Sequence, residues 1–287
     1  MDYELWNKLS HAMFDVARAF PHVARRRFTS HQIVRIYLWA VLHDQPVYWA
    51  VDPRNWDRRM RPAELPNQST MSRRLRCGET LEFLTRLARR VAGRSRPEWI
   101  KAIDGKLLRV AKHSGDGDAT FGYGQGGFAK GYKLHAIWAD TPMPAAWTVR
   151  PLNEGETTVA RTLIQQLDDE GYLLADKAYD RNHLYDLAAE HGQQLVAPRK
   201  KPGTGLGHRK HSPQRLRSVQ LLEMDWRRFG RGLFAYRKQI ERNFAGLGNF
   251  GAGLQSLPPW VRTLGRVQLY VHAKLIINAA RIRRIRA

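Results

Sequence analysis

Short apolar runs alternate with segments of helical spacing between residues 99 and 197, and this alternation constrains the fold more than any other feature. The apolar runs predict strands at 99–103, 132–139, 145–149, 172–175 and 194–197. Apolar positions three and four residues apart predict helices at 156–169 and 182–191. Strands that alternate with helices are typical of an α/β sheet, and no fixed-period repeat points to a solenoid instead.

The first 97 residues are predicted to be all-helical and basic. Helical spacing runs through 2–20 and 33–41, and Thr29 or Ser30 suits the N-cap of the second helix. A third helix begins after Asn67 or Ser69 and carries Arg73, Arg74 and Arg76. A short capped helix of this kind is the form that a helix-turn-helix DNA reader takes, and any basic surface helix has the same form. Both interpretations stay open at this point.

The chain is strongly basic, and its charges are unevenly distributed. Its formal net charge is +22, of which residues 1–100 contribute +8, residues 101–200 contribute −1 and residues 201–287 contribute +15. A field of this sign attracts polyanions, either nucleic acid or an anionic membrane face. Basic ends around a segment rich in acids suit a nuclease-like protein, in which cationic surfaces flank an anionic metal pocket. A basic ribosome-associated or architectural protein is the alternative that composition leaves open.

Cysteine usage and hydropathy indicate an intracellular protein without a membrane segment. Cys77 is the single cysteine, which excludes a disulfide framework and suits the reducing cytoplasm. The amino-terminal sequence lacks the basic and apolar regions of a secretory signal. The most apolar segment, 267–280, is interrupted by His272 and Lys274, so no membrane-spanning helix is expected.

Two aspartates, Asp104 and Asp176, each follow directly after a predicted strand. In an open α/β sheet, functional sites gather at the carboxyl ends of the strands. Phosphodiester cleavage at neutral pH is served by two hard cations, which prefer rigidly held oxygen ligands such as carboxylates. The two positions therefore suggest a metal site, although a solvated aspartate at one strand end is unremarkable.

A third carboxylate, Glu241, lies on the helix predicted over about 234–247. The inward stripe of this helix consists of Tyr236, Ile240, Phe244 and Leu247. Glu241 lies beside that stripe. A carboxylate at the edge of a buried helix face can point into a cleft. Arg237 precedes it by one turn, where the guanidinium can orient the carboxylate or hold a phosphate. A routine surface salt bridge has the same spacing.

Two further segments lack a clear element. Residues 199–217 contain no acid and seven basic residues, namely Arg199, Lys200, Lys201, Arg209, Lys210, Arg215 and Arg217. We interpret them as a mobile loop that seeks phosphates. Residues 122–127 formally match a dinucleotide-binding glycine pattern, but they follow no complete strand–helix unit and lead into another strand. We therefore attribute the glycines of this segment to close approach of their backbone to DNA, or to simple flexibility.

Four segments in this order resemble the DDE transposases of bacterial insertion sequences. They are Ile-Asp-Gly-Lys at 103–106, Lys-Gly-Tyr-Lys-Leu-His at 130–135, Leu-Ala-Asp-Lys-Ala-Tyr-Asp at 174–180 and Tyr-Arg-Lys-Gln-Ile-Glu-Arg-Asn-Phe at 236–244. The resemblance runs from about residue 98 to 280. It implies a ribonuclease H-like α/β domain over 98–287, with a mixed sheet, flanking helices, a basic insertion at about 199–228 and a helical tail. The helical region over 1–97 would bind the ends of the element.

The same resemblance implies the site and its cofactor. Asp104, Asp176 and Glu241 would be the catalytic residues and would bind two Mg²⁺ ions, for which Mn²⁺ can substitute. The residues expected to contact DNA are Lys106, Lys130, Lys133, Lys177, Arg237, Arg73, Arg74, Arg76, Arg199, Lys200, Lys201, Arg209 and Lys210. The family's glutamate helix often carries a tyrosine seven residues before the glutamate and a lysine seven after it, where this chain has Phe234 and Gly248.

The implied activity is cleavage of DNA at the ends of the element and joining of the freed 3′-hydroxyls to target DNA. The implied partners are double-stranded DNA, at terminal inverted repeats and at the target, and at least one further copy of the chain in a synaptic complex. This activity would take place at the bacterial nucleoid. Three alternatives remain: a related nuclease without strand transfer, an inactive or domesticated DNA-binding relative, and a basic RNA-binding protein.

Overall fold

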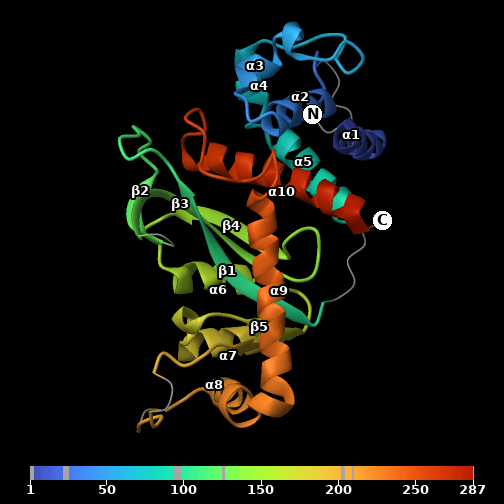
Figure 1. Ribbon diagram of the computed structural model, residues 1–287. Coiled ribbons are helices and arrows are strands. Elements are labelled where there is room, and N and C mark those ends of the chain that lie inside the picture. Colours follow the sequence, from blue (N-terminus) through green and yellow to red (C-terminus); the bar gives the residue numbers. More distant parts are fainter. Residues whose placement is uncertain are drawn as a thin grey trace. The chain divides into compact units, whose positions relative to one another are not determined.

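The computed structural model describes residues 3–21, 26–93, 98–124, 127–201, 204–208 and 210–286, apart from the side chains of 239, 240 and 283–286. These residues form two compact units (Figure 1). The first unit lies within Met1–Arg94, Leu247–Leu254 and Leu269–Ala287, and the second lies within Ser95–Gly246 and Gln255–Gln268. The second unit contains the alternating strands and helices.

A mixed sheet is the centre of the second unit. The strands of the described residues are β1 (Ile100–Arg109), β2 (Thr120–Gly124), β3 (Gly127–Trp138), β4 (Ala146–Pro151), β5 (Gly171–Leu174) and β6 (Gln193–Val196). Their order is β2-β3-β1-β5-β6, and β4 also pairs with β3. The neighbours β1, β5 and β6 are parallel, whereas β3 is antiparallel to β1, β2 and β4. The mixed α/β architecture expected from the sequence is therefore confirmed.

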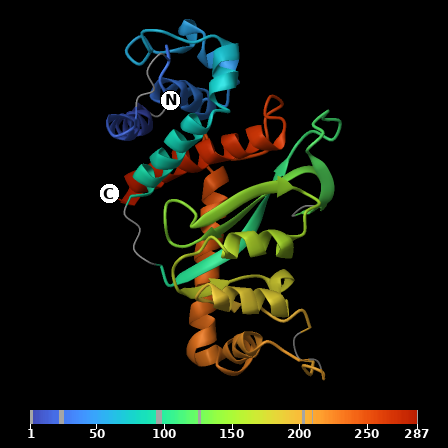
Figure 2. The same ribbon diagram turned by 180° about the vertical axis from the view of Figure 1, so that it is seen from behind.

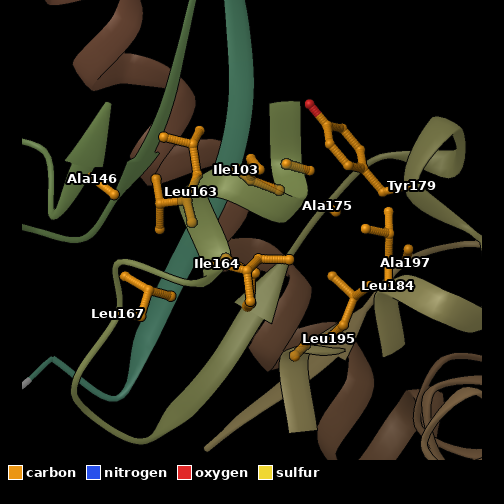
Figure 3. Packing of buried hydrophobic residues seen from close by; sticks show 14 of the residues in the cluster. Ile103, Ala146, Leu163, Ile164, Leu167, Ala175, Tyr179, Leu184, Leu195 and Ala197 are labelled. Atoms are coloured by element: carbon orange, nitrogen blue, oxygen red, sulfur yellow. The ribbon is translucent and has the colours of Figure 1, made fainter. Parts of the chain in front are cut away.

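One face of this sheet is covered by α6 (Glu156–Ile164) and α7 (Asn182–Glu190), which Figure 2 shows in front of the strands. Side chains of a strand alternate between the two faces, so Ile103 and its cross-strand partner Ile137 point to this side. They join a buried cluster that includes Leu163, Leu184 and residues of β5 and β6 (Figure 3). Each aliphatic side chain removed from water in this way contributes about 1.5–3 kcal/mol.

The opposite face of the sheet is crossed by α9 (Arg231–Gly248), the long helix in front of the strands in Figure 1. Phe244 packs edge-on against Trp138 with the ring centroids 5.4 Å apart. Asn243 donates a hydrogen bond from Nδ2 to the carbonyl oxygen of Ala139 at 3.0 Å. These contacts anchor α9 one turn beyond Glu241, and they fix that glutamate on the face to which Asp104 points.

The basic insertion is more ordered than its composition indicates. It contains α8 (Pro213–Val219), followed by two π-helical turns, η3 (Gln220–Met224) and η4 (Trp226–Gly230). The backbone N–H of Ala197, directly after β6, donates to the buried Ser218 hydroxyl at 3.2 Å. The loop predicted to extend to residue 217 therefore ends earlier, because Pro213 starts a helix that packs on the sheet.

The first unit is helical in its described residues, as predicted. It contains α1 (Tyr3–Arg18), α2 (Ser30–Leu42), α3 (Val47–Ala50), the 3₁₀ turn η1 (Pro53–Asn55), α4 (Gln68–Arg74), α5 (Gly78–Ala92) and the latter part of α10 (Leu264–Arg286). Thr29 and Gln32 form a capping box at α2, and Asn67 caps α4. The core holds Trp39, which stacks on Trp56 with ring centroids 4.5 Å apart.

A buried lysine ties the carboxyl-terminal helix into this first unit. Lys274 donates to the carbonyl oxygens of Val41 and Ala252, at 3.1 and 2.8 Å, and to a carboxylate oxygen of Asp44 at 2.5 Å. Burial lowers the pKa of Lys274, an effect that the hydrogen bond and charge of Asp44 oppose. The cation thus supports packing between segments that are distant in sequence. No helix among the described residues is long and apolar enough to cross a membrane.

Candidate active site

Asp104 and Asp176 occupy equivalent positions relative to two parallel strands, Asp104 within β1 and Asp176 two residues after the end of β5. The last pair in the parallel ladder of β1 and β5 is Ala102 with Leu174, and each aspartate follows two residues later. The prediction that Asp104 ends a strand is corrected, because β1 continues to Arg109. Beyond Ala102, β1 leaves β5 and pairs only with β3, so Asp104 lies where the sheet opens.

Local hydrogen bonds hold both aspartates in place. Asp104 accepts a hydrogen bond from the Gly105 N–H at 2.7 Å. Asp176 caps the 3₁₀ turn η2 (Lys177–Tyr179) and accepts from the Ala178 N–H at 2.7 Å. A Cβ atom at position 105 would lie 2.8 Å from the Lys133 side chain, so glycine here leaves room for that lysine on the face of the sheet opposite Asp104.

Glu241 comes from α9 and forms the ion pair with Arg237 that its spacing predicts. Arg237 Nη2 lies 3.0 Å from Glu241 Oε1, and the side chains are 19% and 45% exposed. The guanidinium carbon also lies 5.7 Å from the centroid of the Phe234 ring. Phe234 occupies the position at which the resembling family often has tyrosine, and here the ring supports the arginine through a cation–π contact.

The charges of Asp176, Glu241 and Arg237 all act on the Asp104 carboxyl. Burial raises the pKa of Asp104, and the negative charges of Asp176 and Glu241 raise it further. The Gly105 N–H and the charge of Arg237 act in the opposite direction. Like charges shift a pKa in this way only at short range. The site therefore concentrates negative charge around Asp104, and Arg237 partly neutralises it.

The donor chemistry of this site suits a hard divalent cation. Carboxylate oxygens are the ligands that Mg²⁺ and Mn²⁺ prefer, and a dication would relieve the repulsion that raises the Asp104 pKa. Within the part of the chain that the structure describes, no three His, Cys, Asp or Glu side chains are clustered closely enough to hold one ion. Glu241 is engaged with Arg237 instead. The metal-ligand set proposed from the sequence thus stays a prediction.

Tyr179 belongs to the apolar cluster beneath α6 and α7, and the charges of Asp104 and Asp176 act on its hydroxyl, although sequence analysis did not single it out. Its side chain is buried, and its hydroxyl has no hydrogen-bond partner among the described residues. Burial raises its pKa well above the usual value, as do the charges of Glu156, Asp104 and Asp176. Figure 3 shows the hydroxyl directed away from Leu184 and Ala197. Its place three residues after Asp176, on a turn that the aspartate caps, is a signal that could have identified it.

The lysines of the sheet that were predicted to contact DNA lie on different faces of that sheet. Lys106 shares the face of Asp104, and burial lowers the pKa of this lysine. Lys130 lies farther along the same face and donates to the Ser114 carbonyl oxygen at 2.8 Å, while Lys177 is exposed. Lys133 departs from the expectation. It lies on the opposite face of β3 and is paired with Glu156 at 2.6 Å, so its side chain is turned away from Asp104.

The basic insertion lines a groove of about 600 Å³ beside α7. Its lining includes the ion pair of the half-buried Arg215 and the buried Asp180, with Nε 2.7 Å from Oδ1. Arg199 is not free for phosphate, since it binds Glu223 at 2.5 Å and the Thr204 carbonyl oxygen at 2.6 Å. The exposed members of the predicted set along the groove are Lys200, Lys201 and Lys210. Arg209 lies outside the described residues.

The three arginines of α4 and its end divide in a similar way. Arg73 and Arg76 are exposed, and Arg76 binds the Ser72 carbonyl oxygen at 3.0 Å. Arg74 is half-buried and pairs with Glu79 at 3.4 Å, and it also donates to the Ser30 hydroxyl at 3.2 Å. Arg73 and Arg76 therefore retain a surface for phosphates, whereas Arg74 supports the packing of the helices.

Comparison with known proteins identifies one family. A family model described as the transposase DDE domain matches residues 95–275, which include Asp104, Asp176 and Glu241. No curated protein matches this chain.

Proposed function

This chain belongs to the transposase DDE domain family, and we propose that it cleaves DNA at the ends of an insertion sequence and joins the freed ends to target DNA. The observation that carries the proposal is the placement of Asp104 and Asp176 two residues beyond the same pair of the β1–β5 ladder, with the pKa of Asp104 raised by burial and, to a smaller extent, by Asp176 and Glu241. Perturbation of a half-buried carboxyl group by two other acids is typical of functional sites.

In the proposed reaction, water attacks a phosphodiester at the element's end and releases a 3′-hydroxyl and a 5′-phosphate. The 3′-hydroxyl then attacks a target phosphodiester, forms the new bond and releases a target 3′-hydroxyl. Asp104, Asp176 and Glu241 would hold two Mg²⁺ or Mn²⁺ ions, which would polarise the phosphate and activate the attacking oxygen. Divalent metals are in general use in this family.

The chain's own groups supply position and charge for this chemistry. Backbone N–H groups hold Asp104 and Asp176 on rigid elements, so little motion is needed when substrate binds. Arg237 pairs with Glu241 on α9 and offers a guanidinium that fits a phosphate bidentately. Lys106 adds a positive charge on the same face of the sheet.

The partners we propose are double-stranded DNA and a further copy of the chain. The net charge of +22 supports binding to the phosphate backbone of terminal inverted repeats and target DNA. Exposed cations at the groove and on α4 provide contacts, among them Lys200, Lys210 and Arg73. Two DNA ends must be held together for joining, so the working complex is at least a homodimer, acting at the bacterial nucleoid.

The proposal is tested by Mg²⁺-dependent cleavage of a plasmid that carries the gene's own flanking DNA. Glu241→Gln removes a proposed ligand, and Glu82→Gln is the matched control because Glu82 forms a similar ion pair with Arg86, four residues later on a helix. We expect breaks at both flanks with the wild-type chain and Glu82→Gln, and none with Glu241→Gln. Breaks without joined products would indicate a nuclease, and binding without breaks would indicate an inactive relative. Preference for structured RNA would overturn the proposal altogether.

A further inference from the structure

The hairpin of β2 and β3 carries three aromatic side chains that face solvent. Phe121, Tyr123 and Phe128 are 45%, 79% and 63% exposed. Phe121 and Phe128 stack with their centroids 5.6 Å apart and their planes within 12°, and Tyr123 meets Phe128 edge-on at 5.2 Å. Isolated exposed apolar residues need no explanation, but a contiguous group of ring faces marks an interaction surface.

The strand register explains why these rings share one side of the hairpin. Phe121 pairs with Lys130, and Tyr123 pairs with Phe128, so all four side chains point the same way. We call Phe121, Tyr123, Phe128 and Lys130 the aromatic platform.

The glycines between the rings belong to the packed side of the hairpin. A Cβ atom on Gly122 would lie 2.7 Å from the Leu152 carbonyl oxygen, and one on Gly124 would lie 3.1 Å from the Leu107 side chain. The glycine pattern therefore lets the ribbon lie closely against the sheet while the opposite side displays the rings. It does not form a dinucleotide-binding loop, because β3 follows it rather than a helix.

Lys130 places a positive charge among the rings. Its ammonium lies 5.7 Å from the Phe121 ring centroid and is held by the Ser114 carbonyl oxygen. Ring faces with a fixed cation suit a ligand that has both flat π-surfaces and negative charge. Nucleic acid has both, but a double helix buries its base faces in the stack. The platform therefore fits an unpaired strand, whose bases can stack on aromatic side chains.

The platform lies on the same face of the sheet as Asp104. Asp104 is opposite Ala136 on β3, and Phe128 and Lys130 follow at even spacing along that strand, so they share its face. Eight residues of a strand span roughly 26 Å. A stacked strand of DNA rises about 3.4 Å per nucleotide, so this distance corresponds to about seven or eight nucleotides.

We propose that the aromatic platform binds an unpaired strand of DNA by stacking of its bases, about seven or eight nucleotides from the bond held at Asp104. The position relative to the bond rests on the proposed function, whereas the binding itself does not. Stacking on a base is sequence-tolerant because every base has a π-face. The platform thus adds strand recognition without sequence specificity.

The first test measures DNA affinity in EDTA, so that binding is separated from cleavage. Fluorescence anisotropy compares a labelled 20-nucleotide single strand with its duplex, using the full chain and two variants, Phe128→Leu and Phe128→Tyr. Leucine keeps the apolar character and loses the π-face, whereas tyrosine keeps the π-face. We expect Phe128→Leu to weaken single-strand binding about tenfold, with duplex binding and the salt dependence unchanged and with Phe128→Tyr close to wild type.

Phe14→Leu is the matched control for this test, because Phe14 is 59% exposed on α1. Equal single-strand affinities for Phe128→Leu and Phe128→Tyr would overturn the proposal, as would an equal loss for single strand and duplex. A change in oligomeric state with unchanged single-strand affinity would identify the platform as a contact between copies of the chain, and would also overturn it.

A second test locates the bound bases. A fluorescent 2-aminopurine is moved along a single-stranded extension beyond the cleavage site, with Glu241→Gln used to keep the DNA intact. We expect quenching about seven or eight nucleotides from the cleavage site, and loss of that quenching in Glu241→Gln/Phe128→Leu. The plasmid assay can show no cleavage while Phe128→Leu still weakens single-strand binding and Phe128→Tyr does not. That result would overturn the proposed function and would still support binding of an unpaired strand by the aromatic platform. Uniform quenching at all positions would overturn the assigned distance.

Discussion

Arg237 donates to Glu241 across 3.0 Å on α9, and the charge of the same guanidinium acts to lower the pKa of Asp104 on β1. One cation therefore faces acids from two elements of the site. The positive charge of Arg237 acts on Asp104 against the charges of Asp176 and Glu241, which raise the pKa of that carboxyl. Because the ion pair is partly exposed, its direct contribution to folding is small. Its main effect is on the position of Glu241.

Replacement of Arg237 by glutamine should reduce cleavage far more than stability. We expect the plasmid cleavage rate to fall about a hundredfold, since loss of the ion pair misplaces Glu241 and displacements of about 1 Å can have effects of that size. The free energy of unfolding in urea should change by less than about 1 kcal/mol. Arg86→Gln, which breaks the ion pair with Glu82, is the control and should cleave normally. Equal rates for the two variants would show that Arg237 has no role in positioning.

Magnesium should stabilise the wild-type chain through Asp104. At a concentration one hundred times its Kd, a ligand that binds only the folded state contributes about 2.7 kcal/mol, or a rise in Tm of roughly 5–10 °C for a chain of this size. Thermal unfolding with and without Mg²⁺ measures the shift. Asp104→Asn should abolish the shift, whereas Asp186→Asn, at an exposed position on α7, should retain it. A shift that persists in Asp104→Asn would place the bound metal elsewhere.

The ion pair of Asp180 and Arg215 should contribute to the stability of the second unit, so that loss of the arginine lowers the free energy of unfolding. Burial acts to raise the pKa of Asp180, but the hydrogen bonds and charge of Arg215 outweigh it and lower that pKa. Arg215→Met leaves a buried carboxylate without its partner, so we expect the free energy of unfolding at pH 7 to fall by about 3 kcal/mol. The double variant Arg215→Met/Asp180→Leu should recover part of this loss.

The pH dependence of that loss follows from the sign of the shift. A depressed carboxyl pKa contributes stability above the usual value of 3.8, and this stability is lost as the pH falls through the folded-state pKa. In Arg215→Met the hydrogen bonds and the charge of the arginine no longer lower the pKa of Asp180, so this carboxyl is protonated at a higher pH in the variant than in the wild type. The difference between wild type and variant in urea unfolding should therefore shrink below about pH 4. A difference that stays constant from pH 7 to pH 3.5 would contradict the assignment to Asp180.

Local signals in the sequence were sufficient for two helix caps and for the ion pair on α9, but not for β2 and α8, which lie in segments that were given no clear element. Asn67 and Thr29 cap helices as their residue types indicate, and the i,i+4 spacing of Arg237 and Glu241 gives the observed ion pair. The apolar run before Asp104 predicted a strand but not its length. The continuation to Arg109 is stabilised by pairing with β3 alone, a long-range contact that periodicity does not encode.

Ion pairs between residues that are distant in sequence also determine which basic side chains remain available to bind DNA. Arg199 and Lys133 belong to basic motifs, yet Glu223 and Glu156, each more than twenty residues away in sequence, neutralise them. Lys274 looked like an interruption of an apolar helix, but Asp44 and two carbonyl groups surround it. A charge pattern gives the net attraction to DNA, and only the tertiary contacts tell which cations are left to provide it.

Lys106 and Lys133 offer a direct comparison of two lysines on neighbouring strands. Lys106 shares the face of Asp104, whereas Lys133 lies on the other face and binds Glu156 at 2.6 Å. We expect Lys106→Gln to weaken duplex DNA binding and to reduce the slope of log K against log salt by about one, as for one lost phosphate contact. Lys133→Gln should leave that slope unchanged and instead lower the free energy of unfolding, because Glu156 loses its partner. Anisotropy titrations from 50 to 200 mM salt measure both slopes. A reduced slope in Lys133→Gln would show that its ion pair with Glu156 opens when DNA binds.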